Sequence, residues 1–295
     1  MRLGAFEINE PVPELNSPHA LAILRPWIDV GDVGSLTMSG LESHFKAVEL
    51  ARLARPGNFF DFTRYRPTLY LENDRREVWV PNTTITYARS ENGPDFLFLR
   101  LLEPHMLGED YIESVLAVLQ RFGVKRYLLL GSMYDMVPYT RPLLVSGMVS
   151  NLRLQNELET AMVAPSEYSG PTTIAYLISQ KAPEMDIETG SLIVHLPQYL
   201  TLENDYRGKA RLMDILSSLY GFPLAQEDTD QAREQEDWVR KAAEHIMQQE
   251  PRYRAILEHL EAAYDARVKK QREETPLSPE LEQLLQDLSK RFGQK

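Results

Sequence analysis

Carboxylates and glycines alternate in one short stretch that could face a bound ligand. Asp29, Gly31, Asp32 and Gly34 follow an apolar run at residues 20–24, which predicts a buried strand. Glycine lets backbone N–H groups approach an anion, so this stretch could cradle a phosphate. However, the pattern is neither G-x-G-x-x-G nor a P-loop, and two aspartates would repel phosphate. We therefore favour a tight turn that requires small residues.

A carboxylate and an imidazole follow a second apolar run. Glu103 and His105 come just after the predicted strand at residues 96–101, at the same sheet edge as Gly31. Such a pair could carry out acid–base chemistry or hold a metal. The six histidines include no H-E-x-x-H spacing, so we predict no metal site. A structural role is favoured for both residues, and also for His195 within a later predicted strand.

Gly131 and Ser132 end a third apolar run, at residues 127–130. A serine there could be a nucleophile, but the elbow motif needs a glycine two residues later, where Tyr134 stands. Arg141 could pair with an anionic ligand in bidentate fashion, although an internal ion pair is the favoured interpretation. We predict no catalytic residue and no cofactor from these patterns.

Tyr168 and Gly170 complete the candidate ligand-binding residues, because they precede a predicted helix at residues 173–181. Strand, glycine-bearing turn and helix recur along the chain, first at residues 20–46 and then at residues 96–131. Such units build a parallel sheet, in which ligands bind at the carboxyl ends of the strands. A β-hairpin is predicted at residues 68–80, where aromatic and β-branched residues flank a polar turn.

Composition limits the possible functions. The 295-residue chain has no cysteine, which excludes thiolate catalysis, cysteine-ligated zinc and iron–sulfur clusters. Its formal net charge of −11 argues against a nucleic-acid partner. No apolar leader and no run of about 18 apolar residues is present, so we expect neither a signal peptide nor a membrane contact, and a cytoplasmic location.

The composition changes near residue 225, after which charged residues become denser and the only glycine is Gly293. We predict a core domain at residues 1–225 and a helical C-terminal extension at 226–295, with its last helix at 279–292. One face of that helix forms an apolar stripe. The stripe could pack on its own core, which is favoured, or contact another subunit; its members are Leu281, Leu284, Leu285, Leu288 and Phe292.

Several ordered motifs together resemble the proteasome-assembly-chaperone family of the second-chaperone type, with its archaeal and bacterial relatives. They cover roughly residues 20–222: WIDVGDVGS at 27–35, FTRYRP at 62–67, LEP at 102–104, FGVKRYLLLG at 122–131, YSGPTTI at 168–174 and LPQYL at 196–200.

The resemblance implies a three-layer α/β/α sandwich with a mostly parallel central sheet, similar to phosphorylase- and hydrolase-like folds. It also implies self-assembly into a homo-oligomer, with a trimer favoured, and a protein complex as a possible partner. It implies no established enzyme activity. Members that dock on the proteasome typically carry tyrosine at the penultimate position, where this chain has Gln294. Direct docking is therefore not expected.

Two functional hypotheses remain open. The leading one is a non-enzymatic, homo-oligomeric interaction factor or assembly chaperone. The alternative is a small-molecule binder or a hydrolase- or phosphorylase-like enzyme, directed at a nucleoside or a phosphate, which rests on fold analogy alone.

Overall fold

The computed structural model describes residues 1–222, 225–250 and 252–274. The chain divides into two compact units, residues 1–242 and 243–295. The boundary lies within helix α6 (Gln226–Gln249), because the first half of this helix binds the core. Asp228 forms an ion pair with Lys209, and the Gln235 side chain accepts a hydrogen bond from the Tyr206 backbone N–H.

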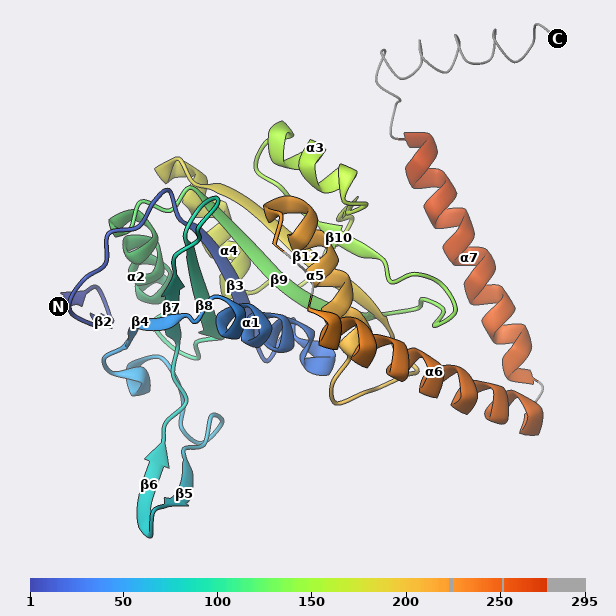
Figure 1. The fold of residues 1–295 in the computed structure, drawn as a ribbon, viewed down its shortest axis with the longest axis horizontal. Coiled ribbons are helices and arrows are strands. Elements are labelled where there is room, and N and C mark those ends of the chain that lie inside the picture. Colours follow the sequence, from blue (N-terminus) through green and yellow to red (C-terminus); the bar gives the residue numbers. More distant parts are fainter. Residues whose placement is uncertain (223–224, 251, 275–295) are drawn as a thin grey trace, which may run out of the picture. The chain divides into compact units, whose positions relative to one another are not determined.

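A ten-stranded mixed sheet forms the centre of the first unit (Figure 1). Its order is β1-β2-β4-β7-β8-β3-β9-β12-β10-β11. The four central strands, β8, β3, β9 and β12, are parallel to one another, whereas β7 and β10 flank them in antiparallel orientation. The strands are β1 (Arg2–Leu3), β2 (Phe6–Ile8), β3 (His19–Arg25), β4 (Val48–Leu53), β7 (Thr84–Ala88), β8 (Phe96–Leu102), β9 (Arg126–Asp135), β10 (Val145–Gly147), β11 (Ala164–Pro165) and β12 (Glu188–Pro197).

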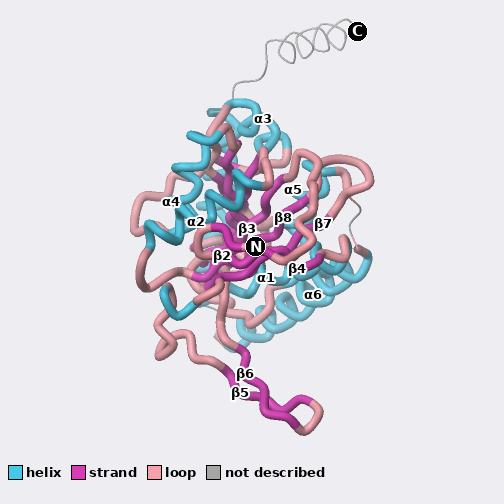
Figure 2. Tube along the Cα trace, turned by 90° about the vertical axis from the view of Figure 1, so that its left-hand side faces the viewer, coloured by secondary structure: helices cyan, strands magenta, loops and turns pink. Residues whose placement is uncertain are grey.

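Helices cover both faces of this sheet, which confirms the predicted three-layer α/β/α sandwich. Helices α2 and α4 pack on one face, and α1, α3 and α5 pack on the other. Figure 2 shows α2 and α4 on the opposite side of the strands from α1 and α5. The bounds are α1 (Val33–His44), α2 (Gly108–Arg121), α3 (Leu152–Thr160), α4 (Ile174–Lys181) and α5 (Tyr206–Tyr220); α7 (Arg252–Glu274) lies in the second unit.

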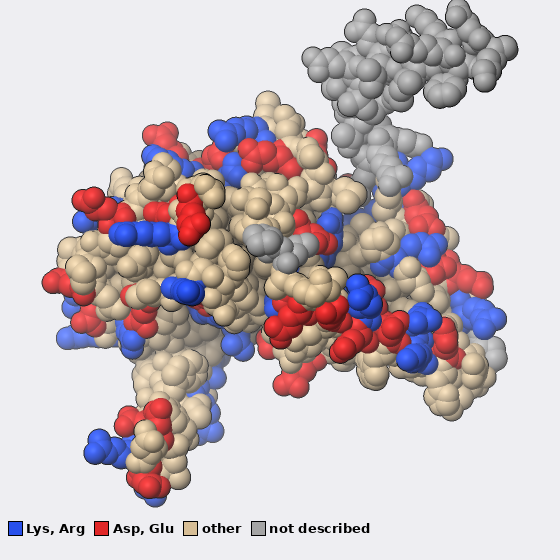
Figure 3. Space-filling model, viewed as in Figure 1, with Lys and Arg blue, Asp and Glu red and all other residues tan. Residues whose placement is uncertain are grey.

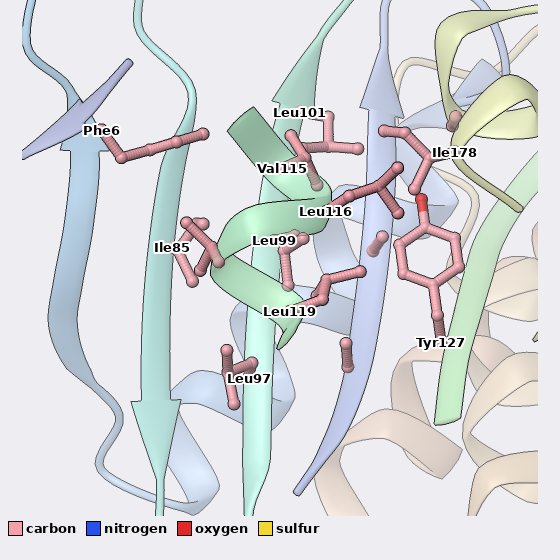
Figure 4. Close-up of a cluster of buried hydrophobic side chains, with 14 of the residues drawn as sticks. Phe6, Ile85, Leu97, Leu99, Leu101, Val115, Leu116, Leu119, Tyr127 and Ile178 are labelled. Carbon is pink, nitrogen blue, oxygen red and sulfur yellow. The ribbon is translucent and has the colours of Figure 1, made fainter. Parts of the chain in front are cut away.

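Alternating side chains of the strands supply two separate cores. On β8, Leu97, Leu99 and Leu101 point to the α2 face, where they meet Val115 and other apolar residues of that helix (Figure 4). Burying one such side chain contributes about 1.5–3 kcal/mol to folding. Two tyrosine hydroxyls lie within this cluster. That of Tyr111 is 2.7 Å from the Thr83 hydroxyl, whereas that of Tyr127 is buried without a hydrogen-bond partner.

Side-chain caps and glycines determine where several helices begin and end. Asn151 accepts a hydrogen bond from the Leu154 N–H at the start of α3, and Asp205 accepts one from Gly208 at the start of α5. Gly221 ends α5 with a φ of 73°, a left-handed conformation that glycine adopts without strain.

The sheet differs from the sequence-based expectation at two places. The first apolar run recognised in the sequence begins at residue 20, but β1 and β2 precede it and extend the antiparallel edge beyond β4. Strand β9 does not stop at Gly131 but continues to Asp135, because β12 pairs with it in register along its whole length. The absence of a side chain at Gly131 therefore does not end the strand.

A separate two-stranded hairpin projects from the core in Figure 1 and confirms the predicted hairpin. It consists of β5 (Thr68–Glu72) and β6 (Arg75–Trp79), and every residue of both strands is exposed.

Candidate functional site

The central strands diverge at one point of the carboxyl edge. Strand β3 pairs with β8 along residues 19–25 but with β9 only along residues 19–22. Parallel α/β sheets bind ligands between two neighbouring strands from which the chain continues toward opposite sides of the sheet. Strands β3 and β9 are such a pair, because the chain continues from β3 to β4 on one side and from β9 to β10 on the other. The predicted glycine-bearing stretch follows directly after β3.

In this chain, however, its own loop fills the opening between β3 and β9. Ile28 accepts a hydrogen bond from the Ser132 backbone N–H at 2.9 Å, and the Ser132 hydroxyl donates to the Val30 carbonyl at 2.6 Å. A Cβ on Gly131 would lie only 2.3 Å from the Ile28 carbonyl oxygen. Gly131 thus allows the loop to lie against β9, and Ser132, which is fully buried, holds it there.

The other residues of the predicted cradle also bind their own chain. The Asp29 carboxylate accepts hydrogen bonds from the Ser35 N–H at 3.1 Å and from its hydroxyl at 2.6 Å. A Cβ on Gly34 would lie 2.9 Å from the Asp29 carboxylate. Gly31 and Asp32 adopt left-handed conformations with φ of 61° and 50°, as a tight turn requires.

Glu103 and His105 line the same pocket, which has a volume of about 950 Å³. The Glu103 carboxylate accepts a hydrogen bond from the Ile174 N–H at 3.1 Å and thereby caps α4. Burial raises the pKa of this carboxyl above its ordinary value, although the Ile174 hydrogen bond opposes the shift. His105 Nδ1 accepts a hydrogen bond from the Asp61 N–H at 3.3 Å.

The rest of this first pocket is mixed in character. Trp27, Phe60, Phe62 and Met106 supply apolar surface, and Trp27 is 66% exposed; Asp61 and Arg64 also line it. We therefore describe the first pocket as an open hollow with an aromatic and apolar wall and charged groups at its edge.

Tyr168 lines a second pocket of about 490 Å³, on the α4 face of the sheet. A Cβ on Gly170 would lie 2.8 Å from the Tyr168 hydroxyl, so Gly170 lets that ring fold back over its own loop. Arg141 lies half-buried in the loop after β9 and lines neither pocket. The structure thus places the predicted residues in a closed turn, around two pockets and, for Arg141, in a separate loop, and ligand binding by them stays a prediction.

The sequence analysis missed a cluster of three polar residues beside the second pocket. Ser146 lines the pocket, and its Oγ lies 2.8 Å from His195 Nε2. The other ring nitrogen, Nδ1, lies 2.7 Å from an oxygen of Asp135. The only sequence signal for this cluster was that Ser146 and His195 are polar residues next to apolar ones. The alternation indicates that they point to the other face of the sheet from those neighbours.

Three further expectations concern a metal site, a membrane span and the C-terminal apolar stripe. Among the described residues, no group of three or more histidine, aspartate or glutamate side chains could hold a metal ion. No helix in the described part of the chain is long and apolar enough to cross a membrane. The apolar stripe at residues 281–292 lies outside the described residues, so its role in a subunit contact stays a prediction.

The chain is thus an α/β/α protein in which its own loop closes the crevice where such sheets usually bind ligands. The family model of the PAC2 family matches residues 23–246, and the chain belongs to this family. A comparison with curated protein sequences gives no match.

Solved structures support this assignment. A PAC2 family protein from Streptomyces avermitilis is 25% identical, with a TM-score of 0.70 over 76% of this chain and 95% of its own. A Mycobacterium tuberculosis protein of unknown function covers 93% of both chains at 22% identity, with a TM-score of 0.76. A proteasome-assembly chaperone homologue from the same organism is 20% identical, with a TM-score of 0.68 over 75% of this chain and 94% of its own.

Proposed function

We propose that this protein is a homo-oligomeric protein-interaction factor, related in role to assembly chaperones, and that hairpin β5–β6 is its main contact element. The observation that carries the proposal is the set of large apolar side chains that the hairpin holds in solvent. Leu71 is 74% exposed, Leu69 61% and Trp79 57%.

An isolated two-stranded hairpin is at best marginally stable in water, and it gains stability when its apolar side chains are buried. The hairpin pairs only within itself, as a two-stranded sheet separate from the main one. Figure 3 shows that acidic and basic side chains also cover it, which favours a specific contact over indiscriminate aggregation. An exposed apolar cluster with a charged rim is typical of a protein-binding surface.

We propose a second copy of this chain as the partner. The first pocket offers a complementary surface, because Trp27, Phe62 and Met106 expose apolar area around a hollow of about 950 Å³. A contact between two different surfaces of the same chain is head-to-tail, and repeated around a rotation axis it closes a ring. A trimer is the ring that we favour. The similarity to a proteasome-assembly chaperone homologue supports an assembly role.

The oligomeric state at micromolar concentration, measured by size-exclusion chromatography with light scattering, tests this proposal. We expect a trimer for the natural chain and a shift toward monomer for Leu71→Lys. Losing one buried leucine costs about 1.5–3 kcal/mol, which weakens each contact roughly 10- to 100-fold.

The matched control is Leu152→Lys, because Leu152 is 76% exposed on α3 and the substitution adds the same charge. It should leave the mass unchanged. A monomeric natural chain would refute self-assembly. A Leu71→Lys chain that keeps its full mass would show that the hairpin is not the contact.

A further inference from the structure

The second pocket has lining residues that suit a neutral organic molecule. It lies between α4 and strands β9, β10 and β12, and none of the described residues that line it carries a charge. Leu129, Met133 and Ile193 supply apolar surface, and serine, threonine and tyrosine hydroxyls supply polar groups. A phosphate would find no cation among these lining residues, which argues against the nucleoside-phosphate alternative.

Three neighbouring strands bring a serine, a histidine and an aspartate together at one end of this pocket. Ser146 on β10 is opposite Ile193 on β12, and His195 follows two residues later on the same face. Asp135 ends β9 opposite Pro197 of β12. Because all three residues lie on paired strands of the central sheet, their mutual positions are held by backbone hydrogen bonds.

The direction of the hydrogen bonds follows from the chemistry of the partners. An ionised carboxylate only accepts hydrogen bonds, so His195 must carry its proton on Nδ1, which lies 2.7 Å from Asp135. In the neutral form of the ring the lone pair is on Nε2, so the Ser146 hydroxyl donates a hydrogen bond to it over 2.8 Å. This is the arrangement in which a histidine can remove a proton from a serine.

The exposure of the three residues agrees with such a role. Ser146 and His195 are both buried, which shields their hydrogen bond from bulk solvent, while Ser146 lines the second pocket, through which an ester and then a water molecule reach it. The Asp135 side chain is 28% exposed, so its charge is partly solvated and costs less to maintain.

From this geometry we propose that Ser146, His195 and Asp135 form a catalytic triad for hydrolysis of small neutral esters bound in the second pocket. Ser146 Oγ attacks the ester carbonyl carbon while its proton passes to His195 Nε2. The C–O bond to the leaving alcohol then breaks, and His195 returns the proton to that alcohol. A water molecule, deprotonated by His195, next attacks the acyl-serine, releases the carboxylic acid and restores Ser146.

Ser191 of the same pocket, two residues before Ile193 on β12, is the hydroxyl that can donate to the oxyanion formed during each attack. Its oxygen is oriented because it accepts a hydrogen bond from the Met148 N–H at 3.0 Å, so its own proton is the group that can donate to the developing negative charge.

The test uses the full chain, a fluorophosphonate probe that reacts with activated serines, and p-nitrophenyl butyrate as a neutral ester. We expect the probe to label Ser146, identified by peptide mass spectrometry, and the ester to be hydrolysed. Ser146→Ala should abolish labelling. Asp135→Asn should lower the hydrolysis rate by about 10³- to 10⁴-fold, because the amide favours the wrong histidine tautomer.

Two controls keep the result decisive. Ser43→Ala removes an exposed serine of α1, on the opposite face of the sheet, and should leave labelling and hydrolysis unchanged. Thermal melting shows whether Ser146→Ala still folds; if it does not, Asp135→Asn and the site of labelling decide the matter. A natural chain that is neither labelled at Ser146 nor active on the ester would overturn the proposal.

Discussion

His19 makes the stability of the fold depend on pH. Its ring lies partly buried at the start of β3, where Nδ1 is 3.0 Å from the Tyr220 hydroxyl. Burial, followed by the nearby charge of Arg126, lowers its pKa from 6.5 to about 4. Glu188 and Glu157 act in the opposite direction and offset only part of this shift. The folded state therefore holds His19 neutral, with the Tyr220 hydroxyl donating to the ring.

The sign of the effect follows from proton linkage. The pKa of His19 is lower in the folded chain than in the unfolded chain, so the unfolded chain takes up the proton first as the pH falls. Stability is therefore complete above about pH 6.5 and is lost progressively down to about pH 4. With these two values, His19 alone should cost the fold about 2 kcal/mol between pH 7 and pH 5.

Urea unfolding, followed by far-ultraviolet circular dichroism at one fixed protein concentration, measures this cost at both pH values. The comparison variant is His19→Asn, because its side-chain oxygen can still accept a hydrogen bond from Tyr220 but does not titrate. Other groups titrate equally in both chains, so their contributions cancel in the difference. The natural chain should lose about 2 kcal/mol more than the variant. If the two chains lose the same free energy of unfolding, His19 is not the titrating group and the reasoning fails.

Two substitutions test the packing around the sheet edge with the same unfolding assay. Gly131→Ala should cost about 1–3 kcal/mol, because its Cβ would lie 2.3 Å from the Ile28 carbonyl and must push the loop away. The matched Gly40→Ala, in the middle of α1 with its nearest contact at 3.4 Å, should instead raise stability by about 0.5–1 kcal/mol; equal effects would contradict the account of the filled opening. Glu103→Ala should cost about 1 kcal/mol by removing the cap of α4, and an unchanged free energy of unfolding would show that the cap adds nothing.

Much of the secondary structure could be predicted because it is encoded locally. Strand β4, residues 48–53, has a local signal, since apolar and polar residues alternate there. Helix α5 begins after Asp205 and ends at Gly221, which are standard start and stop signals. The ends of β9 could not be predicted in this way, because its continuation past Gly131 depends on pairing with β12, a strand more than 50 residues later.

The candidate site was harder to predict than the fold, for a related reason. The carboxyl edge of the parallel strands was located correctly, but the loop that fills it could not be foreseen from glycine spacing alone. The backbone hydrogen bond from Ser132 holds Ile28 against Gly131, and no local sequence pattern predicts this bond. Ser146 and His195 are 49 residues apart and meet only because β10 and β12 pair in one particular register.

The order of the strands also bears on how the chain matures as it is synthesised. Strands β1, β2, β4, β7, β8 and β3, all within the first 102 residues, form one continuous side of the sheet, and β9, β12, β10 and β11 form the other. The N-terminal strands can therefore pair among themselves early. The outer edge of β3, however, stays unpaired until β9, which ends at Asp135, has been synthesised. At about 5–20 residues per second, that apolar edge stays open for several seconds of translation. The partly synthesised chain therefore passes through a stage in which this edge is open to aggregation or to protection by chaperones.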